Sequence, residues 1–271
     1  MNQNPLLAPL FARVTVALSR TSHPGNIGSA ARALKTMGFS RLALISPAIF
    51  PAPEATALAS GADDVLEKAR VTDTLDDALR DAACAVAVSA RARDLGPTLL
   101  SARAGAAEIM RCAAAGEEIA VLFGNETSGL SNDELRRCQY ALMIPANPEY
   151  SSLNLAAAVQ VVCYELRMAA LSEAERTFKD AGAQPGTGAD TRALAMGRVT
   201  PYASARATQG DLEAFYAHLE KVMRASGFLH PERPGRLMPK LRRLFARARP
   251  EREEINILRG LLSTWPEKES L

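Results

Sequence analysis

A glycine-containing loop followed by an arginine has the residue types needed to bind a phosphate group. The stretch SRTSHPGNIGSAARALKTMGF (residues 19–39) follows a strand-like segment and begins a helix. Gly25 and Gly28 would let backbone N–H groups approach an anion at the start of that helix. Arg32, on the same helix, could bind a phosphate bidentately. An arginine at such a position more often lies in solvent, so the pattern leaves both interpretations open.

A dinucleotide-binding loop is the obvious alternative for this stretch, and two features disfavour it. The glycine spacing is G-x-x-G rather than G-x-G-x-x-G. The next strand-like segment ends in Ile45, Ser46 and Pro47, where a dinucleotide fold places an acid for the ribose hydroxyls. The missing acid also disfavours the common Rossmann-type methyltransferase. A dehydrogenase is therefore a weak hypothesis.

The stretch from Val121 to Glu165 contains two more loops suited to ligand binding. Its sequence, VLFGNETSGLSNDELRRCQYALMIPANPEYSSLNLAAAVQVVCYE, predicts a strand, a glycine-containing loop, a short helix, a second strand, a polar loop and a long apolar helix. Ser131 and Glu134 form a capping-box pattern at the start of the short helix. Both loops follow strands, so we expect them to open at one edge of a parallel sheet, where ligands bind.

The elements that must position these loops alternate between strand and helix, which predicts an α/β fold with a parallel sheet covered on both faces. Short apolar runs predict strands at Val14–Leu18, Arg41–Ile45, Cys84–Val88, Ile119–Phe123 and Tyr140–Ile144. Predicted helices cover 27–37, 54–60, 75–82, 100–115, 131–138 and 153–171, followed by three amphipathic helices at 209–226, 234–248 and 250–264. We therefore predict a first domain over 1–171, a linker over 172–200 and a helical extension over 201–271.

Composition is typical of a reduced, globular protein. The 271 residues are 48% hydrophobic and 23% charged. No run approaches the roughly 20 apolar residues of a membrane span, and the N-terminus lacks a signal-peptide pattern. The four cysteines contain no C-x-x-C pair and the three histidines are far apart, which disfavours disulfides and a metal site. We expect a cytoplasmic protein with no metal and no membrane association.

The helical extension carries a concentration of positive charge. Residues 236–249 (RLMPKLRRLFARAR) include six basic residues and no acid. Arg236, Lys240, Arg243 and Arg247 follow helical spacing and share one face. The pattern indicates either the solvated face of a packed helix or a phosphate-binding ridge.

Three motifs of this chain resemble those of the SPOUT, or α/β-knot, RNA ribose 2′-O-methyltransferases. They are NIGSAARALKTMGF, FGNETSGL and IPANPEYSSLNLAAAVQVVCYE, in the order and spacing typical of that family. The tail RLMPKLRRLFARARPEREEINILRGLL resembles the C-terminal extension of TrmJ-type tRNA methyltransferases. The resemblance covers residues 13–170 and 201–264.

The resemblance implies a parallel sheet with a deep C-terminal trefoil knot, which is an exception to the rule against threaded chains. It also implies a homodimer that binds S-adenosyl-L-methionine in the knot, largely through backbone groups. The positions that match the cofactor contacts of the family are Val88, Ser89, Ala90, Gly124, Ile144, Ser151, Ser152 and Leu153. These are small or apolar residues, for which core packing or a simple turn is the plain structural alternative.

The implied chemistry is in-line attack of a ribose 2′-hydroxyl on a sulfonium methyl group. The leaving group is a neutral thioether, so alignment and proton removal are the main demands. The family's motifs match Arg32 and Ser152 to this task, with Asn26 and Glu126 completing the polar shell. A guanidinium keeps its proton in proteins, so phosphate positioning and alkoxide stabilisation suit Arg32 better than a role as base.

Some neighbouring polar residues have alternatives that the sequence leaves open. Ser152 could instead cap the helix that starts near Asn154, and Asn154 could tie the knot crossings together. Glu126 could orient Arg32 or brace the loop. Related sequences can carry arginine where this chain has Asn125, so phosphate contacts there are expected to be redistributed.

The expected substrate is the first nucleotide of the tRNA anticodon loop, a cytidine or uridine. The candidate RNA contacts are Arg32, Arg236, Lys240, Arg242, Arg243 and Arg247. Their affinity for RNA should fall steeply with salt. Two alternatives remain: an enzyme of the same fold that acts on ribosomal RNA, and a non-catalytic RNA-binding protein with the same fold.

Overall fold

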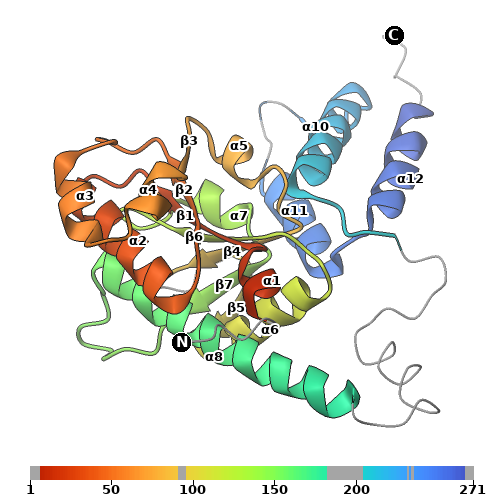
Figure 1. The fold of residues 1–271 in the computed structure, drawn as a ribbon. Helices are drawn as coiled ribbons and strands as arrows, with labels where there is room; N and C mark the ends of the chain where they lie inside the picture. Colours follow the sequence, from red (N-terminus) through yellow and green to blue (C-terminus); the bar gives the residue numbers. More distant parts are fainter. Residues whose placement is uncertain (1–6, 91–95, 182–203, 231, 233–234, 266–271) are drawn as a thin grey trace.

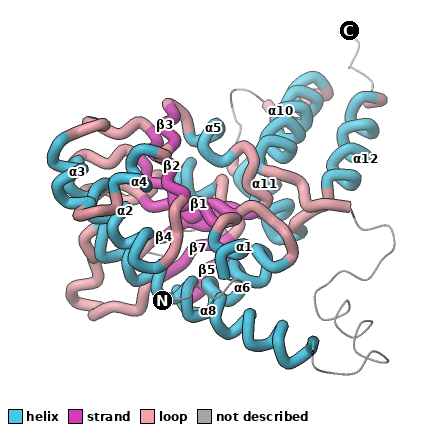
Figure 2. Tube along the Cα trace, viewed as in Figure 1, coloured by secondary structure: helices cyan, strands magenta, loops and turns pink. Residues whose placement is uncertain are grey.

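The computed structural model describes residues 7–90, 96–181, 204–230, 232 and 235–265. Its centre is a seven-stranded, all-parallel sheet in the order β3-β2-β1-β6-β4-β7-β5. The strands are β1 (Val14–Ser19), β2 (Arg41–Ile45), β3 (Arg70–Thr72), β4 (Cys84–Val88), β5 (Thr98–Ser101), β6 (Ile119–Phe123) and β7 (Tyr140–Met143). The predicted α/β class with a parallel sheet is confirmed (Figures 1 and 2).

All nine predicted helices are present, with shifted ends. The helices are α1 (Leu7–Phe11), α2 (Pro24–Met37), α3 (Pro53–Ala59), α4 (Asp63–Glu67), α5 (Leu75–Leu79), α6 (Ala102–Ala114), α7 (Asn132–Arg136), α8 (Leu155–Ala181), α10 (Gln209–Ala225), α11 (Leu237–Ala248) and α12 (Arg252–Ser263). Helices α1 and α4 and strands β3 and β5 were not predicted from the sequence. Both missed strands are short edge strands with little buried surface, so their apolar signal is weak.

The two faces of the sheet carry side chains of different size. One face presents Val16, Val86, Val121 and similar large residues, which pack under α2, α6 and α8. The other face presents mainly alanines, which pack under the short helices α5 and α7. The alanines are Ala17, Ala43, Ala85, Ala87, Ala120 and Ala141.

Helix α8 is longer than expected and runs into the predicted linker. It continues to Ala181, so the first ten residues assigned to the linker are helical, and residues 182–200 lie outside the described residues. By length and composition alone, Leu155–Ala174 could cross a membrane, although Gln160, Glu165 and Arg167 interrupt its apolar sequence. Its apolar side includes Val159, Val162 and Leu166, which are fully buried in the core of the first domain.

The helical extension has its own small core and docks on the first domain. Phe215, Tyr216 and Phe245 form its aromatic centre, with Ile255 and Leu262 from α12. Helix α10 contacts α5, and α11 contacts α7, so the extension lies beyond the alanine-bearing face of the sheet (Figure 1). The three amphipathic helices predicted for this region are confirmed.

Candidate active site

Four loops leave the carboxyl ends of four adjacent strands. In the order β1-β6-β4-β7, these strands end at Ser19, Phe123, Val88 and Met143. Because all the strands are parallel, the loops that follow them meet at one edge of the sheet, where α/β folds bind ligands. The expectation that the predicted loops open at one edge is confirmed.

Glu126 connects the loop after β6 to the loop after β1. Its Oε1 accepts hydrogen bonds from Nδ2 of Asn26 at 2.8 Å and from the N–H of His23 at 3.3 Å. Its Oε2 accepts from the hydroxyl of Ser22 at 2.8 Å and from the Ser22 N–H at 3.1 Å. Burial alone would raise the pKa of Glu126, but the hydrogen bonds from Asn26 and Ser22 outweigh it and lower the pKa from 4.5 to about 2. Through these hydrogen bonds Glu126 braces the loop of residues 19–26.

Asn154 adds the loop before α8 to this network. Its Nδ2 donates to Oδ1 of Asn26 at 3.1 Å, while its Oδ1 accepts from the N–H groups of Ala156 at 2.9 Å and Ala157 at 3.4 Å. Asn154 thus caps α8, a role that the sequence analysis had offered to Ser152. Ser152 is exposed and takes no part in this cap.

A second glutamate, Glu134 of α7, connects the start of the loop after β1 with the end of the loop after β6. Its Oε1 accepts from the hydroxyl of Ser19 at 2.5 Å, and its Oε2 accepts from Nη2 of Arg20 at 2.7 Å and from the Ser131 N–H at 2.6 Å. The capping box with Ser131 is confirmed. The contacts with Ser19 and Arg20 have no local sequence signal, because the partners lie more than 100 residues away.

The loop after β6 is shaped by its own residues. Asn125 Oδ1 accepts from the N–H groups of Thr127 at 3.2 Å and Ser128 at 2.7 Å, which closes a tight turn. A Cβ on Gly124 would lie 2.1 Å from the carbonyl carbon of Gly129, so only glycine allows the loop to fold back this closely. Asn125 therefore has a structural task inside its own loop.

The glycines at the start of α2 serve packing, which corrects the expectation that they expose N–H groups to an anion. Both lie inside the helix and are buried. A Cβ on Gly28 would lie 2.0 Å from the carbonyl oxygen of Ala55, and one on Gly25 would lie 2.6 Å from Oε1 of Glu54. They allow α2 and α3 to approach closely.

Arg32 is exposed on α2. Within the described part of the chain it forms no ion pair, so its guanidinium remains available to a ligand.

The chain matches two family models along most of its length. Residues 13–164 match the SpoU rRNA Methylase family, and residues 210–270 match the C-terminal domain of the tRNA methyltransferase TrmJ. The chain belongs to the SpoU methylase family. It is therefore an S-adenosylmethionine-dependent methyltransferase, as the resemblance of its motifs implied.

Full-length relatives place it in the TrmJ branch of that family. It is 46% identical over 257 residues to a protein of Klebsiella pneumoniae named tRNA (cytidine/uridine-2′-O-)-methyltransferase TrmJ, covering 94% of this chain and 97% of the relative. The protein of the same name from Cronobacter sakazakii is 45% identical over 256 residues, which are 94% of this chain and 96% of the relative. The crystal structure of TrmJ from Z. mobilis ZM4 superposes with a TM-score of 0.74 at 32% identity, covering 92% of this chain and 97% of that one.

In this SpoU-family methyltransferase, the expected cofactor residues lie where the strands β4 and β7 end side by side. Val88 pairs with Leu142 in the sheet, and the Ser89 N–H donates to the Leu142 carbonyl at 3.0 Å. Val88 and Ile144 are half-buried against the core on the face of the sheet that presents Val86 and Val121. Ala90 is exposed, and Ser151, Ser152 and Leu153 lead into α8. Small side chains at strand ends suit a cofactor that is held by backbone groups.

The basic side chains of α11 fall into two groups. Arg236, Lys240, Arg243 and Arg247 are exposed, as expected of RNA contacts. Arg242 is bound within the chain: its guanidinium forms two hydrogen bonds with Glu213, at 2.5 and 2.7 Å, and lies 4.4 Å from the centre of the Tyr216 ring. Arg242, listed from the sequence among the candidate RNA contacts, is therefore engaged by a glutamate of α10, which helical spacing alone does not show.

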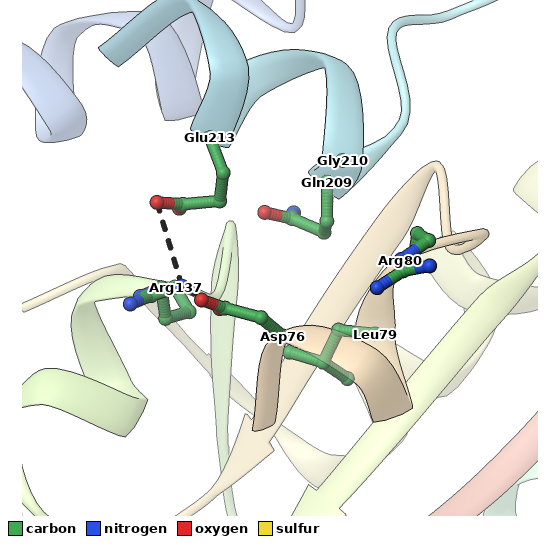
Figure 3. A pocket seen from close by; sticks show the side chains of 7 residues that line it. All are labelled: Asp76, Leu79, Arg80, Arg137, Gln209, Gly210 and Glu213. Carbon is green, nitrogen blue, oxygen red and sulfur yellow. Dashed lines mark hydrogen bonds and ion pairs between the residues drawn. The ribbon is translucent and has the colours of Figure 1, made fainter. Parts of the chain in front are cut away.

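A pocket of about 190 Å³ lies elsewhere, where the extension docks on α5 and α7 (Figure 3). Its walls include Gln209 and Glu213 of α10, Asp76 and Arg80, and Arg137, which forms a 3.4 Å ion pair with Glu213. Arg80 and Arg137 precede β4 and β7, so the pocket lies at the amino edge of the sheet. It is separate from the four loops at the carboxyl edge, which we call the catalytic-side loops.

Proposed function

We propose that this chain is a tRNA ribose 2′-O-methyltransferase that modifies the first nucleotide of the anticodon loop, a cytidine or uridine. The tRNA methyltransferase names of relatives that match it end to end support a tRNA substrate. The connection of three motif loops by Glu126, Asn26 and Asn154, with Arg32 exposed on the same helix as Asn26, carries the proposal that the chain is catalytic.

The reaction needs a ribose 2′-hydroxyl in line with the methyl group and sulfur of the cofactor. The bound cofactor supplies an electrophilic methyl group and leaves as a neutral thioether. Arg32 would bind the substrate phosphate and stabilise the developing alkoxide, since its guanidinium keeps its proton. Ser152, which is exposed and does not cap α8, would contact the 2′-hydroxyl. Asn26 and Glu126 would hold the loop of residues 19–26 in place.

The residues proposed to hold the cofactor are Val88, Ser89, Ala90, Gly124, Ile144, Ser151, Ser152 and Leu153, within the expected trefoil knot. Gly124 would act through the close fold of its loop, because its own Cβ position is filled by the loop backbone.

A homodimer in the cytoplasm is part of the proposal. Tyr164 and Met168 are exposed on α8 at helical spacing, with 47% and 42% of their surface free. A second copy covering this face would remove their apolar surface from water. Light scattering on the wild type and on a Tyr164→Glu, Met168→Glu variant tests this, and a monomeric wild type contradicts it.

The decisive experiment measures methyl transfer from labelled S-adenosylmethionine to unmodified tRNA, with mapping of the product nucleotide. Arg32→Ala is compared with Lys35→Ala, which removes another cation from the same helix. We expect a 2′-O-methyl group at the first anticodon-loop nucleotide, lost only in Arg32→Ala. Label in ribosomal RNA alone would overturn the substrate, and binding of RNA without any transfer would overturn the catalysis.

A further inference from the structure

A buried carboxylate, Glu134, uses both oxygens to join the loop after β1 to the start of α7. Only 7% of the residue is exposed. One oxygen accepts from the Ser19 hydroxyl, and the other accepts from the Arg20 guanidinium and the Ser131 N–H. Ser19 ends β1, and Ser131 follows the loop after β6 directly. Glu134 therefore fixes the first turn of one catalytic-side loop to the end of the other.

The turn that Glu134 holds has an unusual backbone. Arg20 has φ of 51°, in the left-handed region that non-glycine residues rarely adopt. Its N–H donates to the Ile45 carbonyl at 2.8 Å, and its side chain reaches back to Glu134. Such a conformation persists only where the surrounding structure determines it, and conformations of this kind are typical of functional sites.

The contacts of Glu134 favour its charged form. Burial alone would raise the pKa of the carboxyl, but hydrogen bonds from Ser19 and Ser131 and the nearby charge of Arg20 outweigh burial and lower it. The group is therefore ionised at neutral pH and forms a charge-assisted bond with Arg20.

Glu134 and Glu126 hold successive parts of one loop. Glu134 binds Ser19 and Arg20, and Glu126 binds Ser22, His23 and Asn26. Asn26 in turn accepts a hydrogen bond from Asn154. Without Glu134, the start of the loop would keep the backbone hydrogen bonds of Arg20 with Ile45 and of Thr21 with Ala48 but lose its connection to α7, and Asn26 and Glu126 would shift.

We propose that Glu134 is a positioning residue for methyl transfer: through Ser19 and Arg20 it sets the path of residues 19–26 and thereby the place of Asn26 at the active site. The inference rests on the proposed function, in which Asn26 belongs to the polar shell of that site. In this role Glu134 acts through Ser19 and Arg20 rather than through direct contact with substrate or cofactor.

The test compares Glu134→Gln with Glu118→Gln. Glutamine keeps an acceptor for the capping box but removes the charge that binds Arg20. Glu118 is a matched control, since it pairs with Arg13 at 3.2 Å and Arg41 at 2.5 Å and joins the same part of the sheet at its amino edge. For each variant, Tm, the Kd for S-adenosylmethionine, and kcat and KM for tRNA are measured.

We expect Glu134→Gln to lower kcat roughly tenfold or more with a KM for tRNA within about twofold, since small misplacements at an active site are costly in rate. Glu118→Gln should keep the wild-type kcat. Glu134→Asp, which keeps the charge on a shorter side chain, should recover part of the rate. The double variant Arg20→Gln, Glu134→Gln should be no slower than the slower single variant, because both substitutions remove the same interaction between Arg20 and Glu134.

Equal kcat values for Glu134→Gln and Glu118→Gln, or a lowered Tm with unchanged kcat, would overturn the positioning role and leave Glu134 a helix cap. A wild-type chain that methylates no RNA would instead overturn the proposed function, so the two failures are distinguishable.

Discussion

Asn154 donates a hydrogen bond from its Nδ2 to Oδ1 of Asn26 at 3.1 Å, although the two residues are 128 positions apart in the sequence. This hydrogen bond joins the loop before α8 to the first turn of α2. With Glu126 bound to the same Asn26, it links three segments that are separate in the chain.

Asn154 has two tasks that one substitution can separate. Aspartate keeps the acceptor for the Ala156 and Ala157 N–H groups but cannot donate to Asn26. We expect Asn154→Asp to retain the wild-type Tm within a few degrees and to lose most of kcat. Asn154→Ala should in addition lose about 1 kcal/mol of stability, since it removes the cap. Chemical denaturation and steady-state kinetics check both, and full activity in Asn154→Asp would show that the hydrogen bond to Asn26 is dispensable.

Glu126 should make the protein sensitive to acid. Its pKa in the folded state is about 2, below the ordinary 4.5. A depressed pKa means that the stabilising contribution is present above pH 4.5 and is lost as the pH falls from 4.5 toward 2. We expect the Tm difference between the wild type and Glu126→Gln to be largest above about pH 5 and to shrink below it. A difference that stays constant down to pH 3 would contradict this assignment.

Arg249 should stabilise the interface between the first domain and the helical extension. Only 12% of its side chain is exposed, and its guanidinium donates to Glu108 and Glu117, both at 2.8 Å, and to Sγ of Cys112 at 3.2 Å. Removing it takes one cation from each of two carboxylates, of which Glu108 keeps its pair with Arg111 and Glu117 keeps Arg206 at 3.9 Å, so the expected cost is about 3 kcal/mol at most. Arg249→Ala should lower stability by that order, whereas Arg247→Ala, an exposed neighbour, should change it little.

The exposed cations of α11 should act on RNA through charge. Changing Arg236, Lys240, Arg243 and Arg247 to glutamine should weaken tRNA binding and flatten its salt dependence, by roughly one unit of slope for each phosphate that is no longer bound. Arg242→Gln should lower stability and leave that slope unchanged, because Arg242 is bound to Glu213. Fluorescence titrations at several salt concentrations measure both.

The strands and motifs that the sequence predicted are those with strong local signals. β1, β2, β4, β6 and β7 are apolar runs, and the capping box of Ser131 and Glu134 lies within four residues. The contacts that assemble the site join distant segments, so Glu126 with Ser22 or Glu134 with Arg20 leave no spacing to detect. Gly28 shows the related difficulty that a glycine at a helix start suits both anion binding and helix packing. Only the nearby carbonyl of Ala55 decides between them.

The extension is fixed at the amino edge of the sheet. The N–H of Gln209 donates to the Ala82 carbonyl just before β4, and Arg249 binds Glu117 just before β6. The catalytic-side loops leave the opposite edge, and a five-residue strand such as β6 separates the two by about 16 Å. An RNA that contacts both within one chain must be at least that long. Mononucleotides cannot span this distance, so we expect them to be poor substrates whatever their base.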